Sequence, residues 1–190
     1  MLHAQSFVMI NSKGFEGAIA IRDNQGTMVL LGLCEGNHCS EKRKKDKGHG
    51  IIVAMTKTIR DDGSCQWSTV RKIKIPKSAD FEDYSAITMD HSTGKVAISS
   101  QEESQVWFGQ LLGLTSDGLW DLDTIEFDKH VGEVYSFPKN NRCETVYCNI
   151  EGIQFIDDST ILAVSDKMKS KQNYACHSKD QSAHLFVIPN

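Results

Sequence analysis

An acid-led strand pattern recurs three times at nearly constant spacing, and it constrains the fold more than any other feature of the chain. The three copies cover residues 16–23, 83–90 and 151–158, and each continues from an acidic residue into a short apolar run and a polar turn. They begin at Glu16, Asp83 and Glu151, which are 67 and 68 residues apart. Repetition at a fixed period is typical of repeat architectures, so the three units are expected to share one local structure.

Further strands are predicted after each acid-led strand, always in the same order. Short apolar runs bounded by turn residues predict these strands. The second strands are expected at 27–33, 95–100 and 160–165, the third at 50–57, 105–112 and 183–189, and the fourth at 68–75 and at either 120–127 or 133–138. No window shows the periodicity of a capped helix. The sequence therefore predicts an all-β protein.

Repeating four-stranded units predict a single β-propeller domain over residues 1–190. About three blades are expected, near 16–76, 83–138 and 151–190, and a strand at 5–11 is expected to complete another blade. Three blades cannot close a ring, because propellers use roughly 4–8 of them. The chain is therefore expected to be a partial ring, or half of a six-bladed ring that a homodimer completes. An all-β sandwich is the alternative fold.

The net charge and the lack of long apolar runs argue against two classes of partner, nucleic acids and membranes. The 190 residues include 21 Lys and Arg and 25 Asp and Glu, which gives a formal net charge of −4. A dedicated nucleic-acid binder would carry a basic excess. No apolar run approaches the roughly 20 residues of a membrane helix. Neither a nucleic acid nor a membrane is expected as a partner.

The cysteine pattern favours disulfides. Among six cysteines, Cys34 and Cys39 have the same spacing as Cys143 and Cys148. An even count with paired spacing favours an extracellular or other oxidising compartment. The alternative is a set of unrelated thiols in a reducing cytosol. The close CxxC spacing of zinc ribbons is absent, which disfavours zinc.

The acids that begin the three units are predicted to hold a metal ion. In a propeller blade the start of the first strand and the end of the second lie on the same face of the ring. Glu16, Asp83 and Glu151 are therefore expected around the mouth of the central channel. Close carboxylates repel, and a divalent cation relieves that repulsion. Calcium is favoured because it takes several oxygen ligands. The alternative is that hydrated acids simply precede strands.

Residues that follow the second strands are expected on the same face. The candidate general bases are Glu35, Glu102 and Asp166. Two Lys-rich loops, at 36–48 and 167–181, would surround the acids with positive charge. They suit an anionic small molecule such as a phosphate ester or carboxylate. The candidate substrate-binding residues are Lys44, Lys167 and Lys169. Solvated connectors are the alternative interpretation of these loops.

The acid-led units resemble two known groups of propellers. Residues 151–158 (Glu-Gly-Ile-Gln-Phe-Ile-Asp-Asp) and 161–167 (Ile-Leu-Ala-Val-Ser-Asp-Lys) are similar to a motif of esterase-like phytase propellers. Glu16-Gly17 resembles the start of the gluconolactonase and regucalcin-like family, in which a first-strand Glu ligates a divalent metal. The resemblance implies a six-bladed type of ring, a divalent metal at Glu16 and Glu151, and hydrolysis of an ester or lactone. Asp83-Tyr84 departs from the Glu-Gly pattern.

These observations predict a divalent-metal-binding propeller of hydrolase type that acts on an ester, lactone or phosphate ester. Whether the chain is an enzyme is left open by the sequence. The alternative is a non-catalytic propeller that binds a protein or a carbohydrate on the same face, since propellers host many unrelated functions.

Overall fold

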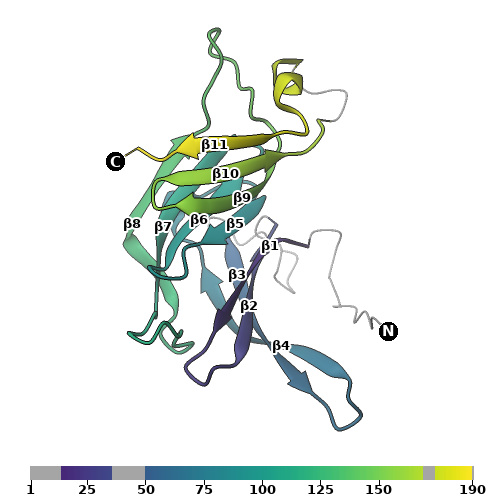
Figure 1. Cartoon of the computed structure of the whole chain (residues 1–190), viewed down its shortest axis with the longest axis vertical. Coiled ribbons are helices and arrows are strands. Elements are labelled where there is room, and N and C mark those ends of the chain that lie inside the picture. The colour runs from purple at the N-terminus through teal and green to yellow at the C-terminus, as the bar shows by residue number, and fades with distance from the viewer. Residues whose placement is uncertain (1–13, 36–49, 169–173, 190) are drawn as a thin grey trace.

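Three antiparallel sheets follow one another along the chain in a computed structural model that describes residues 14–35, 50–168 and 174–189 (Figure 1). The first sheet is β1 (Phe15–Arg22), β2 (Met28–Cys34), β3 (Ile51–Ile59) and β4 (Cys65–Lys74). The second is β5 (Ala86–Met89), β6 (Lys95–Ser100), β7 (Gln105–Leu112) and β8 (Glu126–Ser136). The third is β9 (Ile150–Asp157), β10 (Thr160–Ser165) and β11 (Ala183–Val187). Two short 3-10 helices are η1 (Lys77–Ala79) and η2 (Tyr174–Lys179). The all-β prediction is confirmed.

Most expected strands are present, and two differ in an informative way. β6, β7 and β10 have the predicted bounds. The fourth strand of the second unit spans parts of both candidate runs, because one long β8 pairs with β7 on both sides of a register shift between Gly109 and Leu111. β5 begins at Ala86, so Asp83 precedes the strand instead of opening it. The expected strand at 5–11 and the loop at 36–48 lie outside the described residues.

The first strands of the three sheets pack against one another, β1 against β5 and β5 against β9 (Figure 1). Gly17 makes the first of these approaches possible, since a Cβ at this position would lie 2.9 Å from Cγ2 of Ile87. The second sheet therefore lies between the other two. Within the described part of the chain the sheets do not close into a ring.

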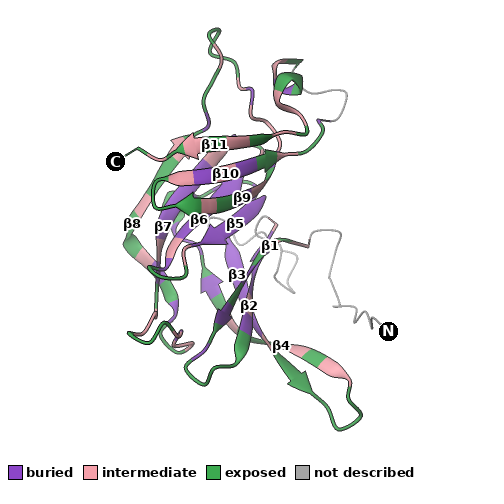
Figure 2. Cartoon of the chain, in the orientation of Figure 1, coloured by how far each residue is buried: buried purple, intermediate pink, exposed green. Residues whose placement is uncertain are grey.

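Two apolar layers hold the sheets together, and Figure 2 shows the second sheet as the most deeply buried. The layer between the first and second sheets includes Leu31, Ile52 and Trp107, all at most 1 % exposed. The layer between the second and third sheets includes Phe108 and Ile161. Both faces of the second sheet are covered, as its consecutive buried residues require.

The third sheet differs from the other two because one of its faces is apolar and exposed. Ile156, Val164, Leu185 and Val187 are 55, 44, 66 and 77 % exposed. Alternate residues of β11 such as Phe186 point the other way and join the core. Among the described strands, β11 is also the outer strand of this sheet, which has three strands where its neighbours have four. An apolar face next to a strand edge is the kind of surface that a further layer of sheet covers.

A disulfide joins Cys148 to Cys176, with 5.7 Å between the Cα atoms, and Cys34 is disulfide-bonded as well. The equal spacing of Cys143 and Cys148 therefore does not indicate a bond between them. The turn that ends at the Lys139–Thr145 bridge places Cys143 at an exposed position with φ of 61°, away from the sheet. The disulfide supports the expected oxidising compartment. No helix among the described residues has the length and apolarity needed to cross a membrane.

Candidate functional site

Antiparallel pairing brings the predicted acids to one end of each sheet. The start of β1 pairs with the end of β2, so Glu16 lies near Glu35, whose amide donates to the Gly14 carbonyl at 3.0 Å. Register shifts between Phe15 and Gly17 place Glu16 in a bulge, and bulges re-aim side chains. The same pairing holds for β5 with β6 and for β9 with β10.

Tyr84 fixes the segment that carries Asp83. Its hydroxyl donates to the Ala79 carbonyl at 2.8 Å and accepts from the Gly50 amide at 3.1 Å. The ring is 1 % exposed, and burial raises the pKa of Tyr84 to about 12. The residue that breaks the Glu-Gly pattern thus anchors the acid before it.

Asp83 is a buried carboxyl with an unused acceptor. It is 7 % exposed, and its Oδ2 accepts from Nε2 of Gln101 at 3.1 Å. Its Oδ1 and the Gln101 Oε1 are both buried without a hydrogen-bond partner in the described part of the chain. Buried acceptors without partners are costly and rare, and a bound ion or water is a common explanation.

The pKa of the Glu16 carboxyl lies above its ordinary value, and the causes show which groups surround it. Burial is the largest cause, because it disfavours the charged form. Repulsion by other carboxylates is next, and these belong to Glu35, Asp83 and Glu151. These four residues are called the acid cluster below. Asp83 and Glu151 therefore each lie close enough to Glu16 for their charges to interact with it.

The raised pKa makes Glu16 a source of pH-dependent stability. A carboxyl with a raised pKa in the folded state stabilises the fold below its unfolded pKa and loses that contribution as pH rises through the folded value. In EDTA at pH 7, Glu16→Gln is therefore expected to melt at a higher temperature than the parent. The difference should vanish near pH 4, about the ordinary pKa of a Glu. Thermal melts across this pH range measure it, with the exposed Asp117→Asn as control. A difference that does not change with pH would contradict the assignment.

A second group of predicted residues lines a polar pocket of about 260 Å³ next to the acid cluster. This acidic pocket is lined by Gln101, Glu102, Cys148, Asn149, Glu151, Asp166 and Lys167. Asn149 organises one wall, since its Nδ2 donates to Oε1 of Glu151 at 3.1 Å and its carbonyl accepts from the Asp166 amide at 3.0 Å. Two candidate bases, one candidate metal ligand and one candidate substrate-binding lysine thus share a pocket.

Gln101 was not predicted, although the sequence held a signal for it. Glu35, Gln101 and Asp166 each directly follow the second strand of their unit. A search for acidic residues predicts Glu102 at this place, yet by position Gln101 corresponds to the other two. Gln101 lines the acidic pocket and bonds to Asp83, so it connects the pocket to the acid cluster. Lys44 and Lys169 lie outside the described residues.

The donor set fits a hard cation, but its side chains are not gathered around one point. Carboxylate and amide oxygens are the ligands that calcium prefers. Among the described residues, however, no three His, Cys, Asp or Glu side chains lie close enough together to hold a metal ion. Binding would therefore require side chains such as Glu16 and Glu151 to turn toward Asp83.

Comparison with known protein families finds no match for this chain. No curated protein matches it either.

Proposed function

We propose that the protein is part of a β-propeller that binds a divalent cation, calcium in the first place, at the acid cluster. Glu16, Asp83 and Glu151 are the proposed ligands. The observation that carries the proposal is that Asp83 Oδ1 and Gln101 Oε1 are both buried and find no hydrogen-bond partner among the described residues. A cation would satisfy both acceptors and relieve the mutual repulsion that raises the pKa of Glu16.

The propeller assignment is supported by the way the sheets are stacked. Each sheet is a sequential antiparallel meander, and their first strands pack side by side. The exposed apolar face of the third sheet supports packing against another sheet, from a longer ring or from a second copy of the chain.

The acidic pocket supports hydrolysis as the activity of this site. Lys167 would attract the anionic part of an ester, lactone or phosphate ester, and Glu102 or Asp166 would accept a proton from water. The bound cation would polarise the substrate's carbonyl or phosphoryl oxygen. Asn149 would hold Glu151 in place through its hydrogen bond. Glu35 is a third candidate base, within the acid cluster.

Calcium is expected to stabilise the parent protein and not its charge-removed variants. At about 100 times the dissociation constant a ligand stabilises the fold by about 2.7 kcal/mol, so the melting temperature should rise by about 5–10 °C. Glu16→Gln, Asp83→Asn and Glu151→Gln should each abolish or strongly reduce the rise. Calorimetric titration of EDTA-treated protein and thermal melts measure the effect.

The exposed Asp117→Asn serves as the matched control, because it removes a carboxylate outside the site and should keep the full response. If all variants respond to calcium as the parent does, or if the parent gives no heat and no stabilisation, the metal proposal is wrong. If calcium binds but no ester, lactone or phosphate ester is hydrolysed, the site binds a cation without this catalysis.

A further inference from the structure

The side of the third sheet that points away from the second sheet is apolar. Leu162 pairs with Leu185 and Val164 pairs with Ala183, and paired residues point to the same side of a sheet. Ile161, next to Leu162, points to the other side and packs in the layer with the second sheet. Val164 and Leu185 are exposed. This surface is called the third-sheet face below.

The first sheet also has an apolar side that points away from the second sheet. Leu30 pairs with Ala20 of β1 and with Met55 of β3. The adjacent Leu31 packs in the layer with the second sheet, so Leu30 points away from it. Leu30, Met55 and Trp67 belong to an apolar cluster whose described members all come from the first sheet. Ala20 is exposed and Leu30 and Trp67 are half-buried on this surface, which is called the first-sheet face below.

The first-sheet face matches a position of the repeated unit that contacts a preceding sheet. The fifth residues of the three units, counted from the acid that begins each, are Ala20, Ile87 and Phe155. Ile87 packs in the layer with the first sheet, and Phe155 packs in the layer with the second. Ala20 therefore has the position that, in the later units, contacts the sheet before.

The third-sheet face matches a position that contacts a following sheet. The third residues of the three predicted second strands are Val29, Ala97 and Leu162. Val29 packs in the layer between the first and second sheets, and Ala97 packs in the layer between the second and third. Leu162 has the same position in the last described sheet. The chain therefore carries both halves of one type of sheet-on-sheet contact.

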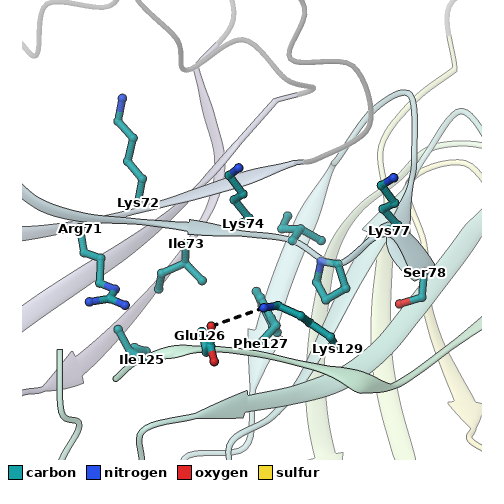
Figure 3. A pocket seen from close by; sticks show the side chains of 12 residues that line it. Arg71, Lys72, Ile73, Lys74, Lys77, Ser78, Ile125, Glu126, Phe127 and Lys129 are labelled. Atoms are coloured by element: carbon teal, nitrogen blue, oxygen red, sulfur yellow. Dashed lines mark ion pairs between the residues drawn. The ribbon is translucent and has the colours of Figure 1, made fainter. Parts of the chain in front are cut away.

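The first-sheet face has a basic rim along β4. Lys72 pairs with Val53 and Lys74 pairs with Ile51, and both partners belong to the apolar cluster on this face. Figure 3 shows the two lysines extending from β4 to the side opposite Ile73, which borders a cavity of about 540 Å³ between β4 and β8. The lysines therefore point toward whatever covers the first-sheet face.

The third-sheet face has an acidic rim. Asp157 pairs with Thr160, which pairs with Val187 on the other side, so Asp157 lies at the end of this face. A hydrogen bond from the Ser159 amide lowers the pKa of Asp157 and keeps its carboxylate charged. β9, β10 and β11 contain no Lys or Arg. The rims of the two faces are thus complementary in charge.

We propose that the first sheet of one copy of this chain docks on the third sheet of another copy. The contact would cover the apolar side chains of both faces, as the second sheet covers those of its neighbours. Because it joins two different faces, the contact is head to tail, and it either closes or continues as a filament. Closure with two copies would give six sheets, and only this number of copies rests on the propeller proposed above.

Sedimentation in EDTA at increasing protein concentration tests the inference, and the parent is expected to form a pair of copies. Ala20→Lys and Leu185→Lys each put a charge on one face. Each should weaken association by about a hundredfold or more, because the contact would bury an unpaired ammonium group. Val131→Lys is the matched control, since Val131 is exposed on β8 outside both faces, and it should associate as the parent does. Circular dichroism confirms that each variant is folded.

Mixing the two variants distinguishes a head-to-tail contact from a contact between like faces. Each variant keeps one intact face, and the two intact faces are different. A mixture of Ala20→Lys and Leu185→Lys should therefore form a two-chain complex that neither variant forms alone.

Three results would overturn the inference. They are a parent that stays monomeric up to its solubility limit, association that either substitution leaves unchanged, and no complex in the mixture. Assemblies of more than two copies that both substitutions disperse would support the contact and contradict the six-sheet ring. Because EDTA is present throughout, the calcium proposal can fail while this inference succeeds.

Discussion

Gly109→Ala is expected to lower the free energy of unfolding by about 3 kcal/mol, at the upper end for overpacking a core. A Cβ on Gly109 would lie 2.0 Å from the Trp107 ring, and one on the cross-strand Gly132 would lie 2.6 Å from its Nε1. The indole is fully buried and its Nε1 donates to Ser78 Oγ at 3.1 Å, so it has no free space to move into. The melting temperature should fall by about 6–12 °C.

A double-mutant cycle separates this overlap from a general intolerance of alanine in β7. Trp107→Phe alone is destabilising, but its smaller ring leaves room beside Gly109. In that background Gly109→Ala should cost less than about 1 kcal/mol, which gives a coupling of about 2 kcal/mol. Chemical denaturation of the four proteins measures the cycle. An equal cost in both backgrounds would show that the ring is not the cause.

Cys176→Ser is expected to lower the free energy of unfolding by about 3.5 kcal/mol. The disulfide with Cys148 closes a loop with a sequence separation of 28, and its loss returns chain entropy to the unfolded state. Cys176 is also 2 % exposed, so a polar hydroxyl would replace a buried sulfur. Denaturation under non-reducing conditions measures the loss.

Cys143→Ser is the matched control, because Cys143 is an exposed free thiol on the same segment. It should have nearly the parent's stability. Reducing agent should lower the stability of the parent and of Cys143→Ser by more than that of Cys176→Ser, because this variant has already lost the Cys148–Cys176 bond and still carries the disulfide of Cys34. A large loss in Cys143→Ser, or no effect of reducing agent on the parent, would contradict the bond.

The order of strands could be predicted from the sequence because it depends on local patterns. Apolar runs and turn residues at regular intervals gave the bounds of β6, β7 and β10, since hairpins form between neighbours in the chain. The extent of β8 could not be predicted in this way. It depends on the register shift between Gly109 and Leu111, which leaves no signal in the hydrophobic pattern of β8.

Part of the candidate site could also be predicted from local patterns. Antiparallel pairing places Glu16, Asp83 and Glu151 at one end of their sheets, and Asp83 and Glu151 both contribute to the repulsion that raises the pKa of Glu16. The roles of Gln101 and Asn149 depend on side-chain hydrogen bonds between units, which no single segment reveals. The cavity between β4 and β8 could not be predicted, because its residues come from two units that are separate in the sequence and no local pattern shows that they meet.

The order of the sheets also bears on how the chain folds as it is made. Every strand neighbour in a sheet is also a neighbour along the chain, so each sheet can complete its backbone pairing before the next segment leaves the ribosome. The slower step is then the docking of finished sheets through their apolar faces. After each sheet forms, its apolar face would stay uncovered until the next sheet docks. Chaperones are expected to bind the nascent chain at these stages.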